Sequence, residues 1–155
     1  MIRKATQEDV PAMVELAEQR RVQYQQYQPT FWRKAADSRE KHTPFLSKLV
    51  QDERVVALVS ERNGVIDGFL IATLVPAPPV YDPGGKTCNI DDFCVAGDSD
   101  WEQLGKALLD EAMREMKARG AVQTVVVCGH LDATKRAMLA EEGFTIASEW
   151  YVRDI

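Results

Sequence analysis

Apolar residues near the start of the chain recur mostly at helical spacing. Residues 2–5 are typical of a short strand. Thr6 then offers a helix N-cap, with Asp9 three residues later and Pro11 in the first turn. The apolar positions that follow are spaced by three or four residues: Val10, Met13, Val14 and Ala17. This spacing predicts a helix to about Arg20.

The pattern is irregular over residues 21–42 and becomes helical again at Thr43-Pro44, where a cap residue precedes a proline. It then changes to strands over 55–61 and 65–74, joined at Asn63-Gly64, a pair typical of tight hairpin turns. A loop rich in proline and glycine separates these strands from another over 86–95.

The second half of the chain predicts a helix from Ser99 to Gly120, which begins with a capping box formed by Ser99 and Glu102. Its buried stripe comprises Trp101, Leu104, Leu108, Ala112 and Met116. An apolar strand over 122–128 should pair parallel with 86–95 as a β-α-β unit, because a helix lies between them.

A short helix over 133–141 and a final strand over 144–155 complete the predicted elements. We therefore expect one domain, residues 1–155, of the α/β class. Its sheet should be mixed but mostly antiparallel, with flanking helices.

The net charge and the cysteines argue against several classes of function. A formal net charge of −5 lacks the basic excess typical of nucleic-acid binders. No run approaches the roughly 20 apolar residues of a membrane span. The three cysteines, Cys88, Cys94 and Cys128, are odd in number and lack metal-ligand spacing, which fits thiols in a reducing compartment. We expect a cytoplasmic protein without a metal, a nucleic-acid partner or a membrane partner.

The order of elements and the stretch 90–109, IDDFCVAGDSDWEQLGKALL, resemble the GNAT N-acetyltransferases over essentially the whole chain. The resemblance implies the GNAT fold and acetyl-CoA as co-substrate. A turn that opens on a helix N-terminus presents unpaired N–H groups, which suit the pyrophosphate of coenzyme A. The cofactor contacts implied by the resemblance are Phe93, Cys94, Val95, Gln103, Leu104, Gly105, Lys106, Ala107 and Asp132.

The proposed phosphate loop departs from the family pattern. Asp100 stands at a position that is usually Gln or Arg, and Gln103 replaces a glycine, so that only Gly105 is retained. Asp98 and Glu102 add further negative charge, which Lys106 offsets in part. A well-capped core helix that binds nothing is the alternative interpretation.

The downstream stretch 132–144 resembles the family pattern that ends in Gly-Phe, with Asp132 in place of the usual Asn. Leu139 occupies the position of the tyrosine that protonates the departing thiolate, and leucine cannot donate a proton. His130 is the nearest substitute by sequence. A loop histidine with only a local hydrogen bond is the alternative.

Asp91 and Asp92 are the other catalytic candidates, in a strand that resembles the diamine and thialysine branch of the family. Because strand side chains alternate, only one carboxylate should face the cleft. By analogy that is Asp91, which could deprotonate an amine. Alternatively, both could be structural, as hydrogen-bonded strand carboxylates beside a bulge. Tyr24, Tyr27, Phe31 and Trp32 could shape an acceptor pocket or form a satellite hydrophobic cluster.

The resemblance thus implies transfer of an acetyl group from acetyl-CoA to a primary amine, by direct attack in a ternary complex. We expect a small-molecule amine rather than a protein amine. The alternative is a catalytically silent GNAT-fold module that binds coenzyme A or a protein partner without turnover. An exposed edge at residues 149–155 makes a homodimer the expected assembly.

Overall fold

The computed structural model describes residues 1–155 and has a single five-stranded sheet at its centre, in the order β1-β2-β3-β4-β5. Neighbouring strands are antiparallel except β4 and β5, which are parallel, as predicted. The strands are β1 (Ile2–Lys4), β2 (Val56–Arg62), β3 (Val65–Val75), β4 (Lys86–Val95) and β5 (Ala121–Val126).

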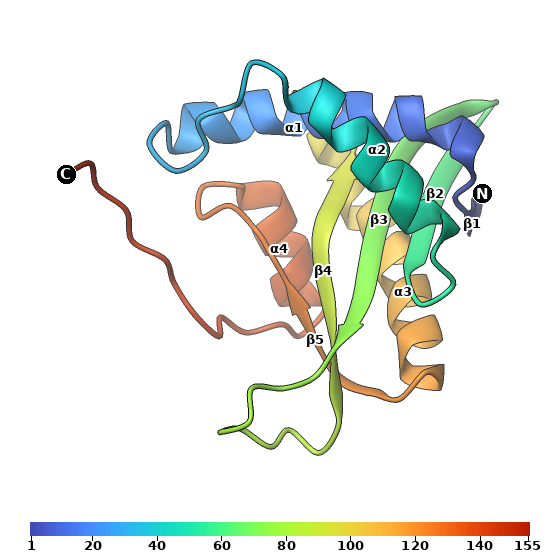
Figure 1. Cartoon of the computed structure of the whole chain (residues 1–155), viewed down its shortest axis with the longest axis vertical. Helices are drawn as coiled ribbons and strands as arrows, with labels where there is room; N and C mark the ends of the chain where they lie inside the picture. Colours follow the sequence, from blue (N-terminus) through green and yellow to red (C-terminus); the bar gives the residue numbers. More distant parts are fainter.

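Helices cover both faces of this sheet (Figure 1). They are α1 (Val10–Tyr27), α2 (Ser38–Gln51), α3 (Lys106–Ala118) and α4 (Ala133–Glu141). One core lies between the sheet and α1 with α2, and it includes Met13, Leu46 and Phe69. The other lies under α3 and α4, and it includes Leu108 and Met138. Apolar residues alternate between these two cores along β2 and β3, which is why the strands read as continuous apolar runs.

The hairpin between β2 and β3 confirms the turn prediction, since Asn63 and Gly64 both have positive φ, 54° and 78°. The first helix is longer than predicted and ends at Tyr27. The helix expected to begin at Thr43 begins at Ser38 instead and contains Pro44. The proline costs the helix one backbone donor, but Thr43 contributes another bond, from its Oγ1 to the Arg39 carbonyl at 2.9 Å.

The segment that enters α3 also differs from the prediction. A 3₁₀ turn over Asp98–Asp100 leads into a π turn over Trp101–Gly105, and regular α-helix begins at Lys106. The prediction of a capping box formed by Ser99 and Glu102 is wrong. The carboxylate of Asp100 instead accepts a hydrogen bond from the Gly97 N–H at 3.1 Å.

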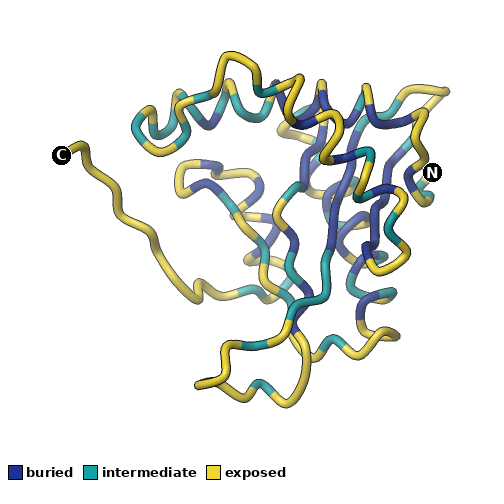
Figure 2. The backbone as a smooth tube through the Cα atoms, viewed as in Figure 1, coloured by how far each residue is buried: buried dark blue, intermediate teal, exposed yellow.

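The predicted final strand is wrong. Residues 145–155 have no regular structure, and all of them are exposed in an arm that leaves the body of the protein (Figure 2). A strand needs a neighbour to satisfy its main chain, and this segment has none in the single chain. No helix of the molecule combines the length and apolar character that a membrane span needs.

Candidate active site

The two parallel strands of the sheet separate where β4 continues beyond its partner. Their last pairs are Asn89 with Val125 and Ile90 with Val126, and the Val127 N–H then donates to the Ile90 carbonyl at 3.0 Å. Beyond this point β4 runs on to Val95 without β5 beside it. The separation leaves main-chain groups of β4 facing a gap.

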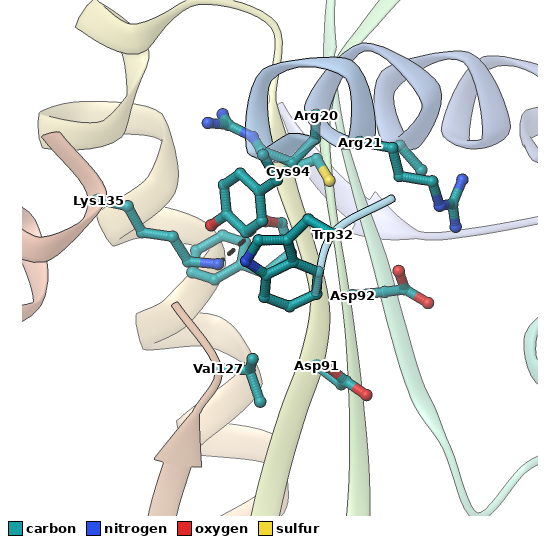
Figure 3. Close-up of a pocket in the computed structure, with 11 residues that line it drawn as sticks. Arg20, Arg21, Trp32, Asp91, Asp92, Cys94, Val127 and Lys135 are labelled. Carbon is teal, nitrogen blue, oxygen red and sulfur yellow. Dashed lines mark hydrogen bonds between the residues drawn. The ribbon is translucent and has the colours of Figure 1, made fainter. Parts of the chain in front are cut away.

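A cavity lies at this separation, beneath α1 (Figure 3). It is lined by Ala17, Arg20, Arg21, Tyr24, Trp32, Asp91, Asp92, Phe93, Cys94, Val127 and Lys135. Four predicted site residues, the run from Asp91 to Cys94, therefore come together here. Of the four aromatic residues considered for an acceptor pocket, Tyr24 and Trp32 line the cavity. Tyr27 and Phe31 do not.

Both neighbouring carboxylates line the cavity, which corrects the expectation that only one could. On β3 a single residue, Ile71, stands opposite both Asp91 and Asp92, because Leu70 pairs with Phe93 and Ala72 pairs with Ile90. The extra residue is a β-bulge, and it breaks the alternation of side chains.

Asp91 has no hydrogen-bond or salt-bridge partner among the protein's side chains, although it borders the cavity. Desolvation by the surrounding protein, and then the negative charge of Asp92, raise the pKa of Asp91 above its usual value of 3.8. A carboxylate in this state is a stronger base than an ordinary surface aspartate.

Asp92 is held by a histidine that sequence reasoning did not connect to it. His42, on α2, is buried, and its Nε2 lies 3.2 Å from an Asp92 oxygen. Its Nδ1 lies 2.9 Å from Arg21 Nη2. Because a guanidinium can only donate, Nδ1 must accept, and the proton of the neutral ring sits on Nε2, facing Asp92. Such a link between elements distant in sequence leaves no local motif.

Lys135, on α4, reaches the gap from the opposite side. It is 2% exposed. Its Nζ donates to the Phe93 carbonyl at 3.3 Å and lies 4.9 and 5.1 Å from the ring centroids of Phe93 and Trp101. Burial lowers the pKa of Lys135 from its usual 10.5. One sequence signal was available, since Lys135 shares a helix face with Met138 and Leu139, both of which are buried.

Asp132 is almost completely buried at the start of α4, where its carboxylate accepts from the main-chain N–H of Lys135 at 3.3 Å. It also accepts from the Tyr24 hydroxyl at 2.8 Å and from Arg20 at 3.2 Å. The same hydroxyl accepts from the Gly129 N–H at 3.1 Å. This network joins α1 to the loop after β5 and so fixes one wall of the cavity.

The phosphate-loop candidates lie on the turn before α3 and on its first turn, outside the cavity lining. Gly105 is buried against Trp101, and a Cβ on it would lie 2.6 Å from the indole ring. Gln103 and Ala107 are exposed, while Leu104 is half-buried. Lys106 is half-buried and hydrogen-bonds to Asp110 and Glu142, so its charge is largely used within the protein.

Two acids of this loop also have cationic neighbours. Asp100 Oδ1 lies 3.5 Å from Arg62, and Asp98 lies 3.8 Å from Arg20.

The remaining candidates lie apart from the cavity lining. Val95 is buried in β4. His130 is exposed and does not line the cavity, so the structure does not bring it to the other candidates. Leu139, at the position of the family's tyrosine, is packed in the core.

Solved structures similar to this one are acetyltransferases or proteins of the same fold. A mutant form of the BH1408 protein from Bacillus halodurans matches with a TM-score of 0.86 at 18% identity, over 100% of this chain and 99% of that one. A predicted acetyltransferase from Clostridium acetobutylicum, solved with acetyl-CoA, matches at 0.76 and 19%, over 99% and 95%. An aminoglycoside antibiotic 6′-N-acetyltransferase from Acinetobacter haemolyticus matches at 0.72 and 13%, over 100% and 99%.

No curated protein matches the chain significantly. The model of the acetyltransferase (GNAT) family, however, matches residues 12–144, which is most of the sequence. Together with the mixed sheet and its separated parallel strands, this match confirms the expected fold and shows that the chain belongs to the GNAT acetyltransferase family.

Proposed function

We propose that this protein transfers an acetyl group from acetyl-CoA to the primary amine of a small molecule, by direct attack in a ternary complex. The observation that carries the proposal is the cavity where β4 leaves β5. It brings an unpartnered carboxylate, Asp91, and a buried amine, Lys135, to the same stretch of main chain. A base and an acid on either side of one strand are what acyl transfer to an amine requires.

The residues present fit coenzyme A at this separation. The buried indole N–H of Trp101 has no acceptor in the protein, and the Phe93 carbonyl accepts from the Lys135 side chain at a point where β4 has no β5 beside it. Main-chain groups of Phe93 and Val95 would hold the pantetheine arm, and the turn around Gly105 would face the pyrophosphate. Bound acetyl-CoA supplies the thioester that is attacked.

Acidic residues weaken the phosphate site less than their number indicates. Asp100 is engaged by the Gly97 N–H and by Arg62, and Asp98 has Arg20 nearby. Opposite charges at such distances offset much of the repulsion that an isolated carboxylate would exert on a phosphate. Asp98 and Glu102 are both exposed, and Glu102 is the one of the three acids without a cationic neighbour.

In the proposed reaction Asp91 removes the proton from the substrate ammonium, directly or through water. Its raised pKa supports this role, because a stronger base takes the proton more readily. His42 fixes Asp92 beside it, which keeps a second negative charge at the amine end of the cavity. The face of Trp32 suits a cationic amine as well.

Lys135 is our candidate for the proton donor to the departing sulfur, in place of the tyrosine that Leu139 replaces. Its Nζ lies against β4 at Phe93, the strand residue proposed to hold the pantetheine. Because burial lowers the pKa of Lys135, its ammonium gives up a proton more easily than an ordinary lysine.

Release of free thiol from acetyl-CoA, measured over a panel of small primary amines, tests the proposal. We expect turnover with at least one amine, and a loss of about 100-fold or more in Asp91→Asn but not in the matched surface variant Asp82→Asn, at an exposed position in the loop before β4. Calorimetry on the same proteins reports binding separately. Binding without turnover on any amine would favour the silent module, and absence of binding would overturn both interpretations.

A further inference from the structure

Lys135 is the one primary amine among the residues that line the cavity. It is 2% exposed, and its Nζ has a single hydrogen-bond partner, the Phe93 carbonyl at 3.3 Å. No carboxylate forms a salt bridge with it, whereas Lys34 and Lys106 each have an acidic partner. We propose that Lys135 is a self-modification site: when no substrate amine is bound, its Nζ takes the acetyl group from bound acetyl-CoA.

The position of the Lys135 amine in the cavity is the first support for this inference, which rests on the proposed binding of acetyl-CoA along β4. With the pantetheine arm on the main chain of Phe93 and Val95, the acetyl group enters the cavity beside Phe93. Lys135 extends from α4 to this same point (Figure 3). The substrate amine is proposed to lie at Asp91. Without a substrate there, Lys135 is the amine held next to the thioester.

The other nucleophilic groups that line the cavity are poorer acceptors. Burial raises the pKa of Cys94 to about 11, so its sulfur stays protonated near neutral pH. The Tyr24 hydroxyl donates to Asp132, and burial raises its pKa above the usual value of 10. The two arginines that line the cavity keep their charge and have no free electron pair. A stable acyl product is therefore expected at Lys135.

The surroundings of Nζ favour the neutral amine, which is the form that attacks a carbonyl. Burial is the main cause of the lowered pKa of Lys135, and the guanidinium of Arg20 acts in the same direction. Asp132 acts in the opposite direction, but Arg20 engages its carboxylate at 3.2 Å. The nearby thiols of Cys94 and Cys128 are protonated, because burial raises both pKa values to about 11.

The transfer needs no further reactant. The neutral Nζ attacks the carbonyl carbon of the thioester, so that an N–C bond forms while the C–S bond breaks. One proton of Nζ passes to the departing sulfur, directly or through water. The products are N-acetyl-lysine and the free thiol of coenzyme A. The cavity, of about 220 Å³, has room for the two carbons and one oxygen that the side chain gains.

Acetylation ends the proton donation assigned to Lys135. It converts the ammonium into an amide, which has no positive charge and no proton to give near neutral pH. The longer side chain also fills part of the space that a substrate needs. The protein therefore inactivates itself when acetyl-CoA is present without an amine, and a substrate amine protects it by removing the acetyl group first.

Incubation with acetyl-CoA alone, followed by intact-mass and peptide-mass measurement, tests the inference. We expect one acetyl group on the peptide that contains Lys135, formed about tenfold or more faster than at any exposed lysine. Lys117, which is exposed, reports the chemical background. Unfolding the protein in urea should remove the preference for Lys135. Acetylation of Lys135 that is no faster than that of Lys117 in the folded protein would overturn the proposal.

Variants and calorimetry complete the test. Lys135→Arg should lose the rapid acetyl gain, and Lys117→Arg should keep it, while the peptide measurement on the wild type does not depend on how either variant folds. Calorimetry with acetyl-CoA separates this inference from the proposed function. Binding with turnover of an amine, but without acetylation of Lys135, would overturn self-modification alone. Absence of binding would overturn both.

Discussion

The Nζ of Lys135 lies 3.3 Å from the main-chain oxygen of Phe93, at a point where β4 no longer has β5 beside it. The contact satisfies a carbonyl that the sheet has left unpaired, and it holds a buried amine at the centre of the candidate site. A purely structural lysine and a proton donor would both occupy this position, but they respond differently to substitution.

Replacing Lys135 separates these roles. Lys135→Arg keeps the charge but cannot release a proton near neutral pH, because the guanidinium pKa exceeds 12. We expect both Lys135→Arg and Lys135→Met to lower kcat by about 100-fold, with a smaller effect on KM. Full activity in Lys135→Arg would contradict the proton-donor role while leaving the family assignment intact.

The stability of Lys135→Met should also depend on pH in a defined direction. Because the pKa of Lys135 is lowered in the folded protein, the unfolded chain holds more protons between that pKa and 10.5. Wild-type stability should therefore rise with pH over this window, relative to the methionine variant. Denaturant unfolding at several pH values measures the difference, and Lys117→Met, on an exposed position, serves as the control. A difference that is constant with pH would mean that the lysine is not desolvated.

The contribution of Asp91 to stability should change with pH in the opposite direction from that of Lys135. Its raised pKa means that folding favours the neutral carboxyl, so stability is lost as pH rises from 3.8 through the folded-state pKa. Asp91→Asn should remove this loss and make the protein more stable than wild type at pH 7, although it removes the proposed base. Urea unfolding at pH 3 and pH 7 is the measurement. A variant that is less stable at pH 7 would show that Asp91 supports the fold rather than the chemistry.

Local patterns predicted most of the fold, because tight turns and the apolar periodicity of helices and strands depend on residues close in sequence. Asn63-Gly64 and the β-α-β unit are examples. A bulge beside Asp91 and Asp92 was part of the structural alternative, but the sequence could not establish it, since it depends on the register between β3 and β4. The pairing of His42 with Asp92 joins elements far apart along the chain. The arm after Phe144 has a strand's composition but no neighbour within the chain, and composition alone does not provide one.

Gly105 offers a test of why one glycine of the loop is retained. A Cβ there would lie 2.6 Å from Cε3 of the buried Trp101 ring, so Gly105→Ala should cost about 1–3 kcal/mol. Its better helix propensity would offset about 1 kcal/mol at most. Thermal unfolding measures the loss. Adding Trp101→Leu should remove the clash, so that Gly105→Ala costs little in that background. An equal cost in both backgrounds would mean that the clash is not the cause.

Tyr24 tests whether the network around Asp132 supports the cavity wall. Tyr24→Phe removes a donor to the buried carboxylate and an acceptor for the Gly129 N–H, so we expect a loss of about 1–3 kcal/mol in unfolding free energy. Burial and the charge of Asp132 raise the pKa of Tyr24 above its usual value of 10, so the hydroxyl is neutral throughout and the loss should be the same at pH 6 and pH 9.

The control for this variant is Tyr81→Phe, at an exposed hydroxyl, which should change stability by less than about 0.5 kcal/mol. A double-mutant cycle with Asp132→Asn then isolates the bond itself. Coupling between positions 24 and 132 is expected, because the two side chains share a 2.8 Å hydrogen bond. Additive losses would mean that Tyr24 acts through its ring, which packs on Gly129, and that the cavity wall does not depend on the Asp132 network.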